Sequence, residues 1–258
     1  MGDDILGLSG ARVAVIGAGQ GIGRAASLLL GRAGAHVALV DEVEERSRSV
    51  ADELDALGAP TCSVTADVTD STQAADAIAE ATSRLGELAC VVNIVGGASW
   101  APLLEMDADT WDRDFRVNLD QHWYVARAAA RRWRDARISG AIVVVASVSG
   151  AFAAPRHGAY GAAKAGLLSL VRTMSEEWWP SVRVNAVVPG AVRTPCIEGA
   201  WAAGEIPKPS SEVVDRMAMP DDIAGAALYL CSPLSARVTG QALVVDGGTT
   251  TRFPYTFD

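Results

Sequence analysis

Short apolar segments alternate with longer helix-like segments from one end of the chain to the other. The apolar segments are rich in β-branched residues and predict strands at residues 13–16, 36–40, 61–66, 88–92, 141–146, 182–188 and 241–245. The longer segments predict helices at residues 22–32, 42–57, 71–85, 107–137, 159–179 and 221–231. Ser71 and Asp107 are the expected N-caps of two of these helices. Residues 194–219 form a looser segment.

This alternation predicts a parallel sheet covered by helices on both faces, because each parallel connection needs a crossover. The continuous apolar run from Ile142 to Val145 is typical of a strand that is buried on both sides. No repeat, low-complexity tract or linker divides the sequence, so we expect a single doubly wound α/β domain over residues 1–258. Ligands of such sheets bind beyond the carboxyl ends of the strands.

A glycine-rich turn follows the first predicted strand and opens the first helix. Gly17, Gly21 and Gly23 have the spacing G-x-x-x-G-x-G, with Gln20 and Ile22 between them. Glycines at this place let backbone N–H groups and a helix N-terminus approach a pyrophosphate closely. The spacing fits neither G-x-G-x-x-G nor a mononucleotide P-loop. By itself the turn is also compatible with a purely structural role.

Asp41 ends the second predicted strand. A carboxylate there can accept hydrogen bonds from the ribose hydroxyls of an adenosine, and it repels a 2′-phosphate. No Lys or Arg stands at the glycine turn before Arg24, or immediately after Asp41, to bind that phosphate. The sequence therefore favours NAD over NADP, although Asp41 also suits a helix N-cap.

A set of four residues, all later in the chain than Asp41, indicates proton-transfer chemistry. Tyr160 and Lys164 lie one helical turn apart and share a face. A phenol has an ordinary pKa of about 10, and a neighbouring ammonium lowers that pKa toward the range of a useful base. Ser147 follows an apolar strand, where its hydroxyl can donate to a substrate carbonyl. Asn118 lies in the long predicted helix and is a candidate anchor for a water chain to the lysine.

Composition excludes several other classes. The chain has 22 Lys and Arg against 31 Asp and Glu, and the resulting net charge of −9 argues against non-specific binding to nucleic acid or to anionic membranes. No apolar run approaches the roughly 20 residues that span a bilayer. The acidic N-terminus lacks the features of a signal peptide. The four cysteines form no C-x-x-C pair, so we expect reduced thiols in a cytoplasmic protein, without a metal site.

Together these residues resemble the short-chain dehydrogenase/reductase superfamily over residues 8–248. The matching positions are the turn at 17–23, Asp41, Asp67, Val68, Asn93, Asn118, Ser147, Tyr160, Lys164, Pro189, Gly190 and residues 245–248.

The resemblance implies a fold and a set of roles. It implies a Rossmann-like sheet in the order 3-2-1-4-5-6-7, a homotetramer, a substrate lid at residues 195–219 and a tail at residues 249–258. Its catalytic tetrad corresponds to Asn118, Ser147, Tyr160 and Lys164, with Tyr160 as acid and base. Its cofactor contacts correspond to Gly17, Gln20, Gly21, Ile22, Gly23, Asp41, Asp67, Val68, Asn93, Tyr160, Lys164, Pro189, Val192 and Thr194.

Two positions depart from the family pattern. Ile16 stands where the family usually has Thr, and the usual N-N-A-G run reads Asn93-Ile94-Val95-Gly96. The lost polar groups brace the central strands in relatives. We therefore expect less local rigidity rather than lost activity.

The leading hypothesis is an NAD-dependent dehydrogenase that interconverts a secondary alcohol and a ketone. Trp100, Phe152 and Trp201 near the expected mouth suggest an apolar or cyclic substrate, although each also suits plain packing. His157 is either a substrate contact or an ordinary loop residue. The aromatic tail residues Phe253, Tyr255 and Phe257 are candidates for a subunit contact.

Two other hypotheses remain open. An acyl-carrier-protein ketoreductase would use the basic side chains of the predicted helices to dock an acidic carrier; these are Arg127, Arg131, Arg132, Arg134, Arg137 and Arg172. The same arginines could instead pair with acids on a solvated or subunit-facing helix. A non-catalytic NAD-binding sensor or scaffold is suggested only by Ile16 and Ile94.

Overall fold

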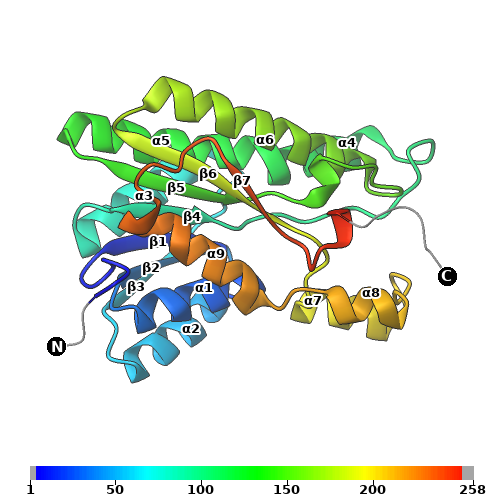
Figure 1. The fold of residues 1–258 in the computed structure, drawn as a ribbon, viewed down its shortest axis with the longest axis horizontal. Helices are drawn as coiled ribbons and strands as arrows, with labels where there is room; N and C mark the ends of the chain where they lie inside the picture. The colour runs from blue at the N-terminus through cyan, green and yellow to red at the C-terminus, as the bar shows by residue number, and fades with distance from the viewer. Residues whose placement is uncertain (1–3, 252–258) are drawn as a thin grey trace.

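Seven parallel strands form one twisted sheet in the order β3-β2-β1-β4-β5-β6-β7 (Figure 1). The computed structural model describes residues 4–251. The strands are β1 (Arg12–Ile16), β2 (His36–Asp41), β3 (Thr61–Thr65), β4 (Cys90–Asn93), β5 (Gly140–Val145), β6 (Val182–Pro189) and β7 (Ala242–Val245). Each predicted strand overlaps one of them, and the expected strand order is confirmed.

Helices cover both faces of the sheet. One face carries α1 (Gly21–Arg32), α2 (Glu44–Ala56) and α9 (Pro220–Cys231), and the other carries α3 (Ser71–Leu85), α5 (Gln121–Ala136) and α6 (Gly158–Trp178). Successive side chains of β1 alternate between these two cores: Val13 and Val15 face the first helix layer, and Ala14 and Ile16 the second. Burial on both faces explains why the strands read as continuous apolar runs.

The sheet also brings two distant cysteines together. Cys90 of β4 and Cys231 of α9 are both buried, and their Sγ atoms are 2.9 Å apart as free thiols. Cys62 is buried as well, whereas Cys196 is exposed.

The long helix predicted at residues 107–137 is interrupted. Asp107 caps α4 (Ala108–Phe115) as expected and accepts a 2.7 Å hydrogen bond from the Thr110 N–H. A π-helical turn (Arg116–Asp120) then separates α4 from α5. Asn118 lies within this turn, and its Nδ2 donates to the Asp114 carbonyl. Side-chain bonds to the backbone of the preceding turn are a known cause of such breaks.

The predicted cap of α3 is wrong by one residue. Asp70, rather than Ser71, has the extended backbone of an N-cap, and its carboxylate accepts from the Thr72 and Gln73 N–H groups. A carboxylate can serve two amides at once and also suits the positive end of the helix.

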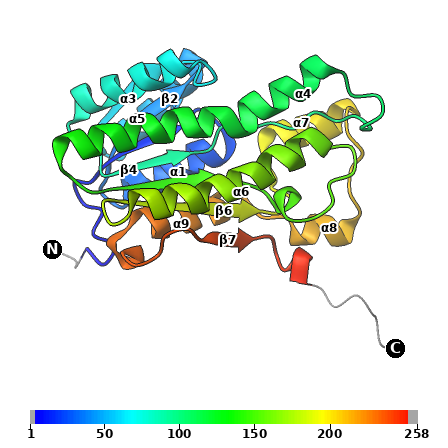
Figure 2. The same ribbon diagram turned by 90° about the horizontal axis from the view of Figure 1, so that it is seen from above.

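The segment at residues 194–219 contains two short helices, α7 (Pro195–Ala203) and α8 (Ser211–Arg216). They lie with α4 at the end of the sheet to which the strands point (Figure 2). The aromatic residues of the expected tail contact lie outside the described residues. Within residues 4–251, no helix is long and apolar enough to cross a membrane.

Candidate active site

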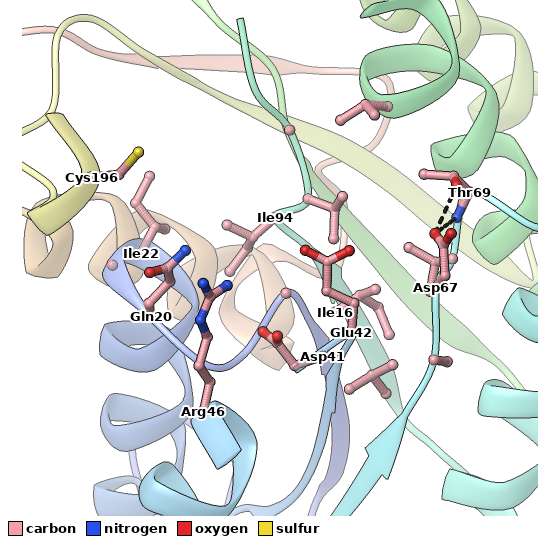
Figure 3. A pocket seen from close by; sticks show the side chains of 18 of the residues that line it. Ile16, Gln20, Ile22, Asp41, Glu42, Arg46, Asp67, Thr69, Ile94 and Cys196 are labelled. Atoms are coloured by element: carbon pink, nitrogen blue, oxygen red, sulfur yellow. Dashed lines mark hydrogen bonds between the residues drawn. The ribbon is translucent and has the colours of Figure 1, made fainter. Parts of the chain in front are cut away.

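A cavity of about 360 Å³ opens beyond the carboxyl ends of β1, β2 and β4 (Figure 3). The predicted cofactor residues that line it are Gly17, Gln20, Gly21, Ile22, Asp41, Asp67, Val68 and Thr194. They come from the first, second and third strand ends and from the start of α7. The cavity thus occupies the place where an open parallel sheet binds its ligand.

The glycine turn is shaped by close backbone approaches. Gly17 and Gly21 have positive φ values of +80° and +52°, which favour glycine. A Cβ on Gly23 would lie 1.8 Å from the carbonyl oxygen of Gly17, so the helix can pack here only without a side chain. The N-terminus of α1 consequently faces the cavity as an open cradle, and its amides fit the pyrophosphate of a dinucleotide.

Asp41 braces the turn and lines the cavity. Its Oδ2 accepts from the Gly19 N–H at 2.8 Å, and its Oδ1 accepts from the Val43 N–H at 3.0 Å. Each carboxylate oxygen keeps a further lone pair, so both bonds are compatible with ribose recognition.

Arg46 of α2 also lines the cavity, and sequence reasoning missed it. Figure 3 shows its guanidinium beside Gln20 and Asp41. The sequence argument for NAD considered only residues next to the turn and directly after Asp41. Arg46 is five residues after Asp41, and helix α2 places its guanidinium on the same wall of the cavity as the Asp41 carboxylate. The lack of a cation therefore does not favour NAD, and only the Asp41 carboxylate does.

Six predicted cofactor residues do not line this cavity: Gly23, whose place in the turn is described above, Tyr160 and Lys164, which are described below, and Asn93, Pro189 and Val192. Pro189 is buried at the end of β6, and Val192 pairs in an isolated bridge with Ala218. Asn93 is buried, and its Nδ2 donates to Oε1 of Gln121 at 2.9 Å. The cavity wall after β4 consists instead of Ile94, Val95 and Gly96.

Gly96 lies between the cavity and the expected catalytic residues. A Cβ there would lie 2.9 Å from Asn118 Oδ1 and 3.1 Å from Lys164 Nζ. Asn118 also holds the adjoining loop, because its amide donates to the Gly97 carbonyl and accepts from the Gly97 N–H. The loop after β4 is therefore fixed to the π-helical turn at the point where cavity and catalytic residues meet.

Ser147, Tyr160 and Lys164 lie together on the other side of this loop. Ser147 follows β5 and is buried, and Lys164 is 2% exposed. Lys164 Nζ donates to the Val145 carbonyl at 2.8 Å and lies 5.7 Å from the centre of the Tyr160 ring. The structure thus brings the predicted tetrad to one place, with the buried amine of Lys164 over the Tyr160 ring.

Burial dominates the electrostatics of this pair. It raises the pKa of Tyr160 above its usual value, while the hydrogen bond with Ser147 lowers that pKa and the charge of Asp114 raises it. Burial lowers the pKa of Lys164 to about 7. Both groups are therefore pushed toward their neutral forms, and phenolate formation requires positive charge nearby.

Gln121 is a second residue that sequence reasoning missed. Its Nε2 donates to the carbonyls of Val95 and Val117, and its Oε1 accepts from Asn93. This buried amide braces the strand end at which Ile94 replaces the usual polar residue. The sequence gives no signal for this role, because Asn93 and Val95 are 28 and 26 residues away from Gln121 along the chain.

Several known proteins are similar to this chain over most of its length. A family model described as enoyl-(acyl carrier protein) reductase matches residues 17–250. Cis-4-hydroxycyclohexanecarboxylate dehydrogenase of Sinomonas cyclohexanicum is 37% identical over 242 residues, covering 93% of this chain and 96% of that protein. L-rhamnose 1-dehydrogenase (NAD(P)(+)) of Azotobacter vinelandii is 33% identical over 243 residues, covering 92% and 95%. A solved structure of a short-chain type dehydrogenase/reductase from Mycobacterium marinum has a TM-score of 0.86 and 32% identity, covering 96% and 98%.

Proposed function

Since the chain belongs to the short-chain dehydrogenase/reductase superfamily, we propose that it is an NAD-dependent enzyme that interconverts a secondary alcohol and a ketone. The observation that carries the proposal is the meeting of Ser147, Tyr160 and Lys164 next to the cavity formed by the glycine turn and Asp41. Oxidoreductase relatives that act on a cyclic hydroxy acid and on a sugar support alcohol chemistry in general.

The chain's own groups suffice for the proton transfers. When bound, the nicotinamide ring accepts or donates the hydride. Ser147 holds the substrate oxygen, and Tyr160 takes the hydroxyl proton during oxidation and returns it during reduction. In its protonated form, Lys164 favours the phenolate, because its Nζ lies 5.7 Å from the centre of the Tyr160 ring.

The decisive experiment is turnover across a panel of secondary alcohols with NAD and NADP side by side, read as absorbance of the reduced cofactor. Tyr160→Phe should lower turnover by roughly 10²- to 10⁴-fold, because it removes the general acid and base. The control is Tyr229→Phe on α9, a half-exposed tyrosine outside the site, which should keep its activity.

Full activity of Tyr160→Phe would refute the mechanism. Tight binding of NADH without turnover of any alcohol or ketone would favour the non-catalytic sensor instead.

The rival carrier-protein reductase finds limited support. Arg127, Arg131 and Arg132 line a groove between α3 and α5. Arg132, however, pairs with Glu87 at 2.6 Å, and Arg127 stacks over the ring of Trp123. These contacts favour the alternative in which the arginines have partners within the chain. Activity with NADP and acyl thioesters, and none with free alcohols, would establish the rival.

Substrate, lid and assembly complete the proposal. We assign an apolar or cyclic alcohol, bound under the lid at residues 195–219. Trp100 is 39% exposed and its ring contacts His157, which in turn lies beside Tyr160, and Phe152 between β5 and α6 is 56% exposed. We also propose a homotetramer. Exposed apolar residues on two separate elements support it, Trp123 on α5 and Leu243 with Val244 on the edge strand β7, because a tetramer of D2 symmetry uses at least two kinds of interface. Light scattering should give four chains per particle.

A further inference from the structure

Two loops form a continuous wall beside Tyr160. The first follows β4 and contains Ser99, Trp100 and Ala101, and the second precedes α6 and contains Arg156 and His157. The Ala101 N–H donates to the Arg156 carbonyl at 2.9 Å, and Nδ1 of His157 lies 3.2 Å from the Ser99 carbonyl oxygen. Both loops lie at the end of the sheet that also carries α7 and α8 (Figure 2).

Ring contacts lead along this wall from the phenol to a guanidinium. The ring centres of Tyr160 and His157 are 6.2 Å apart, and those of His157 and Trp100 are 4.4 Å apart in an edge-to-face arrangement. The guanidinium carbon of Arg156 lies 6.0 Å from the Trp100 ring centre. A substrate whose hydroxyl reaches Tyr160 would therefore extend along His157 and Trp100 toward Arg156.

Arg156 is held in an unusual backbone conformation. Its φ is +66°, in the left-handed region that bulky residues rarely adopt. The other such non-glycine residue among those described is Arg137, which ends α5 as an ordinary left-handed cap. Arg156 ends no helix, and glycine would adopt its conformation without strain. Persistent strain of this kind clusters at ligand sites.

The charge of Arg156 is not neutralised by the described side chains. The ion pairs of the structure involve other arginines. Asp114, a buried carboxylate that contacts the first loop, accepts the N–H and the hydroxyl of Ser99. An exposed guanidinium that packs over an aromatic ring suits a ligand with an apolar body and an anionic end.

We infer that Arg156 binds the carboxylate of the substrate, so that the enzyme acts on hydroxy acids whose apolar ring or chain packs on Trp100 and His157. The inference rests on the proposed function for the position of the reacting carbon. The alternative is that Arg156 binds no ligand and is a solvated side chain that only packs on Trp100.

A binding experiment tests the inference without turnover. Cyclohexanecarboxylate and its neutral amide are titrated calorimetrically into the full-length protein with saturating NAD. The acid should bind about 10- to 100-fold more tightly than the amide, as expected for a charge-assisted contact. Arg156→Gly should bring this ratio close to one while relieving the backbone strain, and Arg156→Lys should retain part of it. Arg172→Ala, an exposed arginine further along α6, should leave the ratio unchanged.

Failure to bind the acid more tightly than the amide, or a ratio that survives Arg156→Gly, overturns the inference. The proposed function is judged separately, by oxidation of 4-hydroxycyclohexanecarboxylate and of its methyl ester. Turnover of both at equal efficiency by the wild-type and Arg156→Gly proteins would sustain the dehydrogenase and remove the anion site. Tighter binding of the acid without turnover of either compound would instead support the anion site and contradict the proposed dehydrogenase activity.

Discussion

Asp41 and Arg46 bring opposite charges to one wall of the cofactor cavity. The carboxylate is fixed by two backbone amides, whereas the guanidinium stands on an exposed helical turn. In the proposed complex, the fixed carboxylate of Asp41 would face the ribose hydroxyls, whereas the exposed guanidinium of Arg46 can also be solvated. This difference in anchoring, rather than the mere presence of either charge, supports a preference for NAD.

The preference can be altered one charge at a time. Asp41→Asn should lower kcat/KM for NAD about tenfold, because a charged hydrogen-bond acceptor is lost, and should raise kcat/KM for NADP. Adding Arg46→Ala to this variant should abolish the gain with NADP. Steady-state kinetics with both cofactors measure the two effects. If the gain with NADP persisted without Arg46, this arginine would have no part in 2′-phosphate binding.

At the scale of elements, the end of β4 depends on a contact with the start of α5. Asn93 and the Val95 carbonyl both bond to the buried amide of Gln121. Because of this brace, Ile94 does not leave the backbone polar groups around it without partners. The expected loss of rigidity at this departure from the family pattern is therefore offset from outside the strand.

Removing the brace should be costly. Gln121→Leu would leave the Asn93 amide and a backbone carbonyl buried without partners, which should lower the free energy of unfolding by about 1–3 kcal/mol. Denaturant melts measure the change. Gln241→Leu is the matched control, because its exposed amide bonds only to the nearby Thr239 carbonyl. An unchanged midpoint for Gln121→Leu would show that water replaces the lost contacts.

The sequence allowed the sheet to be predicted far better than the details of the site. Continuous apolar strands, and pairs one helical turn apart such as Tyr160 and Lys164, depend only on residues that are close in the sequence. They can therefore be predicted without knowing the tertiary structure. The π-helical turn depends on Asn118 bonding to both its own helix and the Gly97 loop, which no periodicity records. The cation of Arg46 and the brace of Gln121 likewise arise from packing between distant segments. Such contacts are set by the tertiary structure.

For the whole molecule, a buried histidine should make stability depend on pH. His122 is fully buried. Burial and then the charge of Lys164 lower its pKa well below 6.5, and the backbone of Val95 offsets only part of this shift. The unfolded chain therefore binds a proton that the folded chain refuses, and stability falls as pH drops below about 6.5. The lowered pKa of Lys164 has the same effect at higher pH: it lowers stability as pH falls from 10.5 to about 7.

Thermal melts between about pH 5 and pH 8 test the histidine contribution, because this window brackets the ordinary histidine pKa of about 6.5. His122→Leu should flatten the fall in melting temperature below pH 6.5, because no histidine remains to be protonated on unfolding. His36→Leu at the start of β2 is the control. An equally steep fall in both variants would assign the acid sensitivity to carboxylates elsewhere.

The distribution of the cysteines provides a chemical reporter that requires no knowledge of the substrate. Burial raises the pKa of Cys62, and the hydrogen bond with Cys90, followed by burial, raises that of Cys231. These thiols therefore resist alkylation in the native protein. Cys196 is exposed and lines the dinucleotide cavity at the start of α7. An alkylating dye should label it first, and a dinucleotide that fills the cavity should slow that labelling in proportion to its occupancy.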